Sequence, residues 1–226
     1  MAEQLSFDLP VRTALGREDF FVSPANAVAV ATIEATAGWP DRKLVLSGPA
    51  GSGKTHLVHV WVRQTGAQIV AASDLTHRDI AALATGPVAI EDVPEILEDL
   101  AAQDALFHLH NLMFAQGQPL LMTGRGTPAH WNIGLPDLQS RIAGTNHVAL
   151  DQPDDNLMAA VLVKLFADRQ ITPKADVVPY LISHIERSFD AASRIVERLD
   201  RIALSERQNL SRTLAARLLG SERPPV

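Results

Sequence analysis

The chain has 226 residues, of which 46% are hydrophobic, and its formal net charge is −6. This length and composition predict a globular protein with one larger domain and a small appendage. The absence of cysteine excludes disulfides, thiolate metal sites and cysteine nucleophiles, and the acidic charge disfavours broad nucleic-acid binding. A non-basic beginning and the lack of a long apolar stretch predict a cytoplasmic protein with no membrane partner.

The first residues form a short segment with large apolar side chains and one polar anchor. It contains Gln4, Leu5, Ser6, Phe7 and Leu9. Because this segment is too short to build a core element, we expect an exposed arm over residues 1–16. Such a peptide either docks in a preformed groove of a partner or folds back onto the body, and the residues alone favour neither alternative.

A helix is predicted from Ala25 to about Ala37, with Ser23 as its N-cap and Pro24 at its first position. Aromatic residues precede it at Phe20 and Phe21. Apolar residues at such a place commonly form the base pocket of a nucleotide-binding core, although plain core packing is the more frequent role.

The next element is the most informative part of the chain, because an apolar strand over 43–47 leads into a glycine-rich loop and then into a helix. The loop reads Gly48, Pro49, Ala50, Gly51, Ser52, Gly53, Lys54, Thr55 and His56. Its glycines allow backbone N–H groups to turn inward around phosphate oxygens, and the helix start adds a partial positive charge. Lys54 would reach the outer phosphates, and the Thr55 hydroxyl would bind Mg²⁺. The pattern predicts a nucleoside polyphosphate site, and the alternative is a glycine-rich turn that matches by chance.

Further along the chain, a predicted strand ends in two carboxylates. We predict a strand over 68–72, a helix from Ser73 or Asp74 to about Ala84, and a buried strand that begins at Val88. That strand ends in Glu91 and Asp92. A carboxylate in this position holds Mg²⁺ and a second one positions an attacking water, so Glu91 is the metal candidate and Asp92 the candidate base. The alternative for Asp92 is to cap the next helix.

The remaining elements complete an α/β core with a helical tail. We expect a helix over 95–115, a strand over 118–123 that ends at Thr123 and Arg125, a short helix over 135–141 and a strand over 146–150. This alternation predicts a mostly parallel five-stranded sheet flanked by helices. We therefore expect a nucleotide-binding core over 17–151 and a small all-helical domain over 152–226.

Taken together, the phosphate loop, the acidic strand end, the Thr123-Gly124-Arg125 segment, the run 132–141 and the helical tail resemble the AAA+ module of the bacterial replication initiator DnaA. The closest likeness is to the Hda group of DnaA-related regulators, which inactivate the initiator after replication starts. The resemblance covers nearly the whole chain. No counterpart of the initiator's DNA-binding helix-turn-helix follows the helical tail, so we expect no direct sequence-specific DNA binding.

The resemblance implies roles for individual residues. Arg141 corresponds to the arginine finger, which is presented to nucleotide on a neighbouring subunit. Thr123 and Arg125 fall at the sensor strand end. The segment around the adenine corresponds here to Phe20, Phe21, Val22 and Asn26. The arm resembles the family's peptide for the DNA polymerase sliding clamp, which favours the docking alternative for Gln4 to Leu9.

Two departures from the family affect the chemistry. The family usually has Asp where this chain has Glu91, and its second sensor arginine corresponds to Asp190. An acid at position 190 would repel a terminal phosphate unless Arg187 or Arg194 substitutes from a nearby turn. Both changes should weaken hydrolysis by the chain itself more than its nucleotide binding.

The sequence thus predicts a regulator that binds ADP or ATP with Mg²⁺, docks on the sliding clamp and uses Arg141 to stimulate ATP hydrolysis by DnaA. A homo-oligomer is possible. A self-sufficient phosphate-loop ATPase or small-molecule kinase is the alternative, and a structural adaptor without nucleotide is disfavoured by the intact Lys54 and Thr55.

Overall fold

The computed structural model of the protein describes residues 21–206 and 208–220. The predicted clamp-binding segment from Gln4 to Leu9 and the candidate base-pocket residue Phe20 lie outside the described residues.

The core is a sheet of five strands that pair in parallel in the order β2-β3-β4-β1-β5. The strands are β1 Lys43–Ser47, β2 Gln68–Ala71, β3 Val88–Glu91, β4 Leu120–Gly124 and β5 His147–Ala149. This arrangement confirms the predicted α/β class. Because all strands run in the same direction, the phosphate loop after β1 and the polar ends of β3 and β4 lie at one edge of the sheet.

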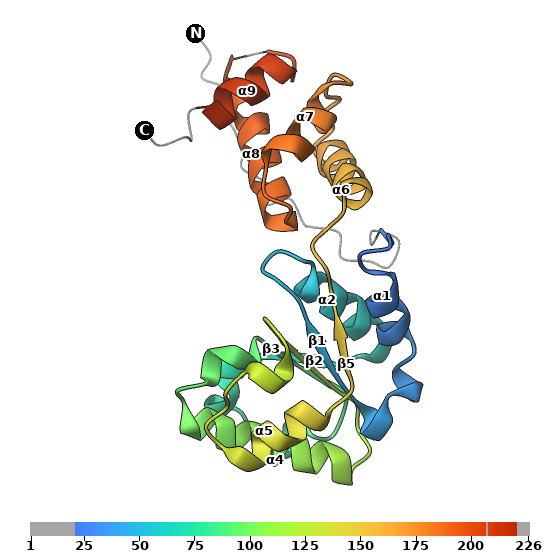
Figure 1. Ribbon diagram of the computed structural model, residues 1–226, viewed down its shortest axis with the longest axis vertical. Helices are drawn as coiled ribbons and strands as arrows, with labels where there is room; N and C mark the ends of the chain where they lie inside the picture. The colour runs from blue at the N-terminus through green and yellow to red at the C-terminus, as the bar shows by residue number, and fades with distance from the viewer. Residues whose placement is uncertain (1–20, 207, 221–226) are drawn as a thin grey trace, which may run out of the picture.

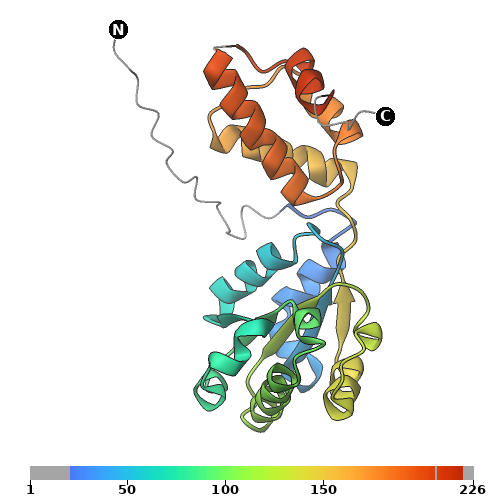
Figure 2. The same ribbon diagram turned by 90° about the vertical axis from the view of Figure 1, so that its left-hand side faces the viewer.

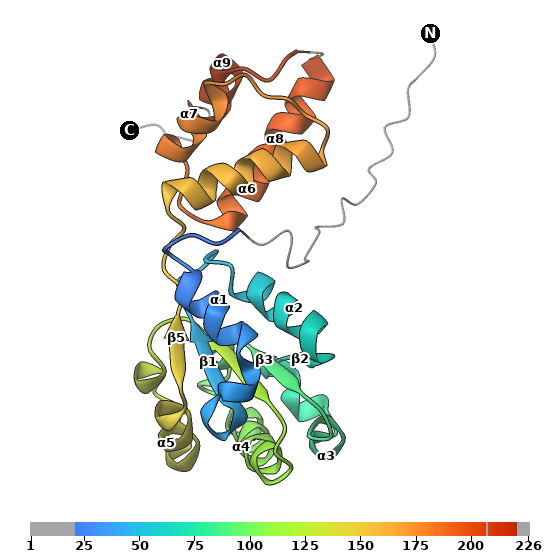
Figure 3. The same cartoon turned by 90° about the vertical axis from the view of Figure 1, so that its right-hand side faces the viewer.

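Helices cover both faces of this sheet (Figure 1). They are α1 Ala27–Glu34, α2 Lys54–Thr65, α3 Ile80–Leu83, α4 Leu100–Ala115 and α5 Pro136–Gly144. Figure 3 shows α1 and α2 side by side on one face, where their apolar residues pack with Leu44 and Leu46 of β1. Val45 points to the opposite face, which α3, α4 and α5 cover. Strands buried on both faces explain the unbroken apolar runs in the sequence.

Four helices follow β5 and form the predicted helical tail, called the lid below. They are α6 Asp155–Asp168, α7 Val177–His184, α8 Phe189–Glu206 and α9 Arg212–Gly220. Their apolar side chains form a cluster separate from the two clusters of the sheet. Figures 1 and 2 show the lid above the edge of the sheet that carries the phosphate loop. Within the described residues, no helix is both long and apolar enough to cross a membrane.

The first helix begins later than predicted. Its N-cap residue is Asn26, not Ser23, and the helix covers Ala27–Glu34. The Ser23 carbonyl accepts from the N–H groups of Asn26 and Ala27, so a turn precedes the helix. The Asn26 side chain accepts from the N–H of Ser23 and donates to the carbonyl of Phe21, both at 2.9 Å. These bonds hold the preceding loop in place.

Two other predicted helices are shorter than expected. A 3₁₀ helix occupies Ala72–His77, and α3 begins only after Asp79, whose carboxylate accepts from the N–H of Ala82. Similarly, α4 starts after Asp99, whose carboxylate accepts from the N–H of Ala102 at 3.0 Å. In both cases an aspartate further along the chain supplies the N-cap and fixes the helix start.

Candidate functional site

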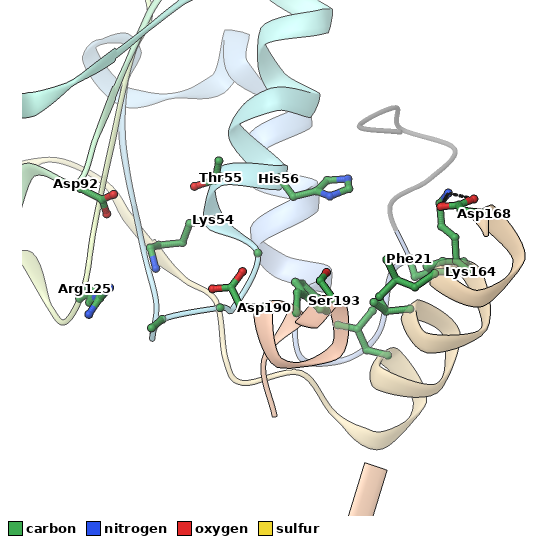
Figure 4. A pocket seen from close by; sticks show the side chains of 17 residues that line it. Phe21, Lys54, Thr55, His56, Asp92, Arg125, Lys164, Asp168, Asp190 and Ser193 are labelled. Atoms are coloured by element: carbon green, nitrogen blue, oxygen red, sulfur yellow. Dashed lines mark hydrogen bonds and ion pairs between the residues drawn. The ribbon is translucent and has the colours of Figure 1, made fainter. Parts of the chain in front are cut away.

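A cavity of about 370 Å³ lies between the phosphate loop, the lid and the loop before α1. Cavities of this size hold small ligands such as nucleotides. Figure 4 shows its polar end around Lys54 and its other end around Lys164 and Asp168. The lining residues are Phe21, Ala50, Gly51, Gly53, Lys54, Thr55, His56, Asp92, Arg125, Leu157, Val161, Lys164, Leu165, Asp168, Phe189, Asp190 and Ser193.

The phosphate loop has a backbone that requires glycine at two positions. Gly51 has φ +67° and Gly53 has φ +95°, values that L side chains rarely adopt. A Cβ atom on Gly51 would collide with Ser188, and one on Gly53 would lie 2.5 Å from the ring of Phe189. The loop therefore needs glycine both for its own path and for the close approach of the lid.

Lys54 is buried at the centre of this loop, with 8% of its surface exposed. Its ammonium group donates to the carbonyls of Gly48 at 2.9 Å and Pro49 at 2.8 Å. Burial lowers the pKa of Lys54, and the neighbouring Arg125 adds to this effect, whereas Asp92 and Asp190 oppose it. The site thus places a cation next to carboxylates from the core and from the lid.

Two further observations fit a bound Mg²⁺ and polyphosphate. The hydroxyl of Ser52 and the Oε1 atom of Glu91 are buried and have no hydrogen-bond partner among the described residues. Thr55 lines the cavity, so its hydroxyl is available to a metal beside phosphates. Buried polar atoms without partners cost free energy, and both atoms belong to residues next to cavity-lining ones, Gly51 and Gly53 for Ser52 and Asp92 for Glu91.

The two predicted carboxylates differ in where they lie. Asp92 lines the cavity, whereas Glu91 is half-buried and does not. Asp92 has φ +54°, an uncommon conformation, and its N–H donates to the hydroxyl of Thr123 at 3.1 Å. Its side chain makes no capping hydrogen bond, so the alternative role as a helix cap is not observed. The Thr123 hydroxyl thus holds the backbone at Asp92, whose side chain lines the cavity.

The described candidate residues of the base pocket lie in three different positions. Phe21 lines the cavity, and Val22 is half exposed outside it. Asn26 is buried and holds the carbonyl of Phe21, so it supports the pocket from behind.

The lid wall of the cavity was not identified from the sequence. It consists of Leu157, Val161, Lys164, Leu165 and Asp168 of α6 with Phe189 and Ser193 of α8. The spacing of Leu157, Val161 and Leu165 marks one helix face, yet that pattern alone does not separate a core face from a cavity wall. Lys164 donates to both carboxylate oxygens of Asp168, at 3.1 and 3.0 Å.

The structure brings only one of the three candidate sensor arginines to the cavity. Arg125, at the end of β4, lines it. Arg187 lies 2.7 Å from the carboxylate of Asp155 and does not line the cavity. Arg194 lines a separate hollow of about 440 Å³ between α7, α8 and α9. Neither lid arginine is therefore positioned beside Asp190 at the phosphate loop.

Arg141 lies far from this cavity. It is exposed on α5, with its guanidinium 5.1 Å from the ring centroid of Phe107. Figure 1 shows α5 at the end of the core away from the lid. Beside it, Lys43 is buried and lies 3.3 Å from Nδ1 of His110. Burial, the charge of Lys43 and that of Arg141 lower the pKa of His110 to about 3. The pKa of Lys43 falls to about 8, chiefly by burial.

No protein-family model matches the sequence. The chain is 25% identical to the chromosomal replication initiator protein DnaA of Cutibacterium acnes over 211 residues, which cover 84% of this chain and 42% of the relative. It thus spans less than half the length of that curated relative.

Solved structures of DnaA have a fold similar to that of this chain. Domain III of DnaA from Thermotoga maritima superposes with a TM-score of 0.81 and 18% identity, covering 96% of this chain and 100% of the other. AMPPCP-bound DnaA from Aquifex aeolicus superposes with a TM-score of 0.69 and 16% identity, over 88% of this chain and 67% of the other. The five-stranded parallel sheet with flanking helices therefore matches the fold of this DnaA domain.

Because His110 of α4 is buried, we expect the folded protein to lose stability in acid. The unfolded chain protonates His110 below about pH 6.5, whereas the folded chain keeps it neutral to about pH 3, so stability falls as the pH drops from 6.5. Between pH 7 and pH 5 this residue should cost the wild type about 2 kcal/mol of unfolding free energy, measured by urea denaturation. His110→Gln should lose less stability over this range, whereas the exposed-site control His108→Gln should behave like the wild type. Equal pH dependence in all three proteins would contradict the prediction.

Proposed function

We propose that the chain, whose sequence and fold are similar to those of DnaA, is an adenine-nucleotide-binding regulator of replication initiation that stimulates ATP hydrolysis by DnaA through Arg141. In this proposal the arm from Gln4 to Leu9 docks on the DNA polymerase sliding clamp, as expected for a protein of the Hda group. ADP or ATP with Mg²⁺ occupies the cavity at the phosphate loop. The division into arm, core over 17–151 and lid over 152–226 is part of the proposal.

The observation that carries the proposal is the location of Arg141. Arg141 neighbours Lys43, the first residue of β1, whereas the phosphate loop follows Ser47, the last residue of that strand. A strand of this length separates the two ends by about 15 Å. An exposed arginine at the far edge cannot serve its own cavity, so its guanidinium is available to nucleotide on another molecule.

The chemistry expected of Arg141 is charge neutralisation. A guanidinium offers two parallel N–H donors to phosphate oxygens and keeps its charge at all physiological pH values. Supplied from a neighbouring subunit, such a group stabilises the charge that develops on a transferring phosphoryl group. The guanidinium lies over the face of the Phe107 ring of α4, a cation–π contact that favours this position of the side chain.

Nucleotide binding by this chain is supported by its own cavity. Lys54 and Arg125 provide positive charge, Thr55 and the carboxylates can hold Mg²⁺, and the apolar lid wall suits a base. A DnaA of the same fold was solved with AMPPCP bound. These observations support an adenine nucleotide as the ligand of the cavity.

The second candidate is an ATPase that acts on its own nucleotide. It is favoured by Asp92, which lines the cavity and whose backbone N–H donates to Thr123. A single assay of ATP hydrolysis by this chain alone distinguishes the two candidate functions, since a self-sufficient ATPase turns over ATP without DnaA. A small-molecule kinase would need an added acceptor.

The role of Arg141 can be tested directly. Arg141→Ala should lower the stimulated rate of ATP hydrolysis by DnaA at least about 10³-fold, the usual effect of an arginine finger, without changing nucleotide or clamp binding. The assay measures phosphate release by DnaA with this chain and DNA-loaded clamp. Arg63→Ala removes another exposed arginine of the core and should leave the rate unchanged. Undiminished stimulation by the Arg141 variant would refute the proposal.

The base end of the cavity gives a second prediction. Phe21→Ala should weaken ADP binding about tenfold in a calorimetric titration, because a base loses an aromatic partner. Val22→Ala, which changes the neighbouring residue outside the cavity, should stay within about twofold of the wild type. Similar losses in both variants would argue against a base beside Phe21.

The clamp-docking arm is tested by capture on immobilised sliding clamp. A chain with Gln4→Ala and Leu5→Ala should be retained at least about tenfold less, since it lacks the polar contact and one apolar anchor. Glu3→Ala changes a neighbouring residue and should be retained normally. Capture of the double variant at the wild-type level would remove clamp docking from the proposal.

A further inference from the structure

The lid presents a carboxylate to the phosphate loop. Asp190, the second residue of α8, lines the cavity, and Figure 4 shows it beside Lys54 at the phosphate end. Its negative charge acts on the ammonium group of Lys54 together with that of Asp92. The phosphate end of the cavity thus contains an acidic side chain that belongs to the lid and not to the core.

Contacts of the preceding residues fix Asp190 in this position. The N–H of Phe189 donates to the carbonyl of Gly51 at 2.9 Å, and the Phe189 ring packs where Gly53 lacks a side chain. Ser188 is buried against Gly51, and its hydroxyl accepts from the N–H of Ala191. Because these contacts anchor the start of α8, the backbone at Asp190 cannot withdraw from the loop unless the lid moves.

The positive charges at this end come from the core. Of the described lysine and arginine side chains that line the cavity, Lys54 and Arg125 lie at the phosphate end, and Lys164 is paired with Asp168 at the other end. An anion that extends beyond the loop is therefore attracted by Lys54 and Arg125 and repelled by two carboxylates, Asp92 of the core and Asp190 of the lid. The third phosphate of a nucleotide is such an anion, since it lies beyond the two phosphates held by the loop.

We propose that Asp190 makes the lid a negative sensor of the terminal phosphoryl group. A nucleoside diphosphate leaves the start of α8 docked on the loop, whereas a triphosphate repels Asp190 and releases the contact between Phe189 and Gly51. The lid would then respond to the state of the nucleotide by opening in the triphosphate state. This inference rests on the proposed nucleotide site. It adds that the site discriminates between nucleoside diphosphates and triphosphates.

The test compares ADP with AMPPCP, which keeps three phosphates, by calorimetric titration of the full chain at one Mg²⁺ concentration. The wild type should bind ADP more tightly. Asp190→Asn should raise the affinity for AMPPCP about tenfold and that for ADP less than about threefold, because repulsion between like charges is removed only in the triphosphate complex. Glu197→Gln removes an acid from an exposed part of the same helix and should leave both affinities unchanged.

Amide hydrogen exchange of the segment containing Phe189 reports the lid contact independently of affinity. Exchange should be slow with ADP and at least about tenfold faster with AMPPCP in the wild type, and slow with both ligands in Asp190→Asn. An unchanged affinity ratio in Asp190→Asn, or equal protection with both ligands in the wild type, would overturn the inference and leave the nucleotide site intact. If neither ligand binds, the proposed nucleotide site fails and this inference fails with it.

Discussion

The contact between the lid and the phosphate loop depends on two residues without side chains. Gly51 and Gly53 adopt conformations that other residues avoid, and they leave the space that Ser188 and Phe189 fill. The hydrogen bond from Phe189 to Gly51 then holds α8 over the loop. Because α6 packs with α8 in the lid, this one contact also places the apolar wall of the cavity. The site is therefore built jointly by core and lid, and its geometry changes whenever the lid moves.

The direction of the strands separates two functional regions. All five strands end at the edge that carries the phosphate loop, Asp92 and Arg125. Arg141 lies near the opposite edge, beside the start of β1. One edge is thus suited to hold a nucleotide, and the other carries the exposed Arg141, which the proposed function assigns to a partner's nucleotide. In the proposed function, this separation lets one chain combine a ligand site of its own with a group that acts on another molecule.

The balance of charge around Lys54 determines what the cavity can hold. Core carboxylates and a lid carboxylate surround a buried ammonium group, and Arg125 supplies a further positive charge. Mg²⁺ beside phosphates would offset the carboxylates, which fits the unpartnered Oε1 atom of Glu91. The lid carboxylate differs from the others because it lies on α8 of the lid and not on the core.

The sequence by itself determined the elements whose signals are local. The apolar strands, the phosphate loop from Gly48 to Thr55 and the helical tail follow from periodicity and glycine spacing, and the parallel sheet follows from their alternation. The first helix starts later than its sequence pattern predicts, because more than one side chain near its start can serve as the N-cap, and the structure has Asn26 there. Only the tertiary structure decided the order of the strands, the apolar wall from α6 and the placement of Asp190, Arg187 and Arg194. The strand order depends on pairing between strands far apart in the chain, and the other features depend on how the lid rests on the core, which no local pattern encodes.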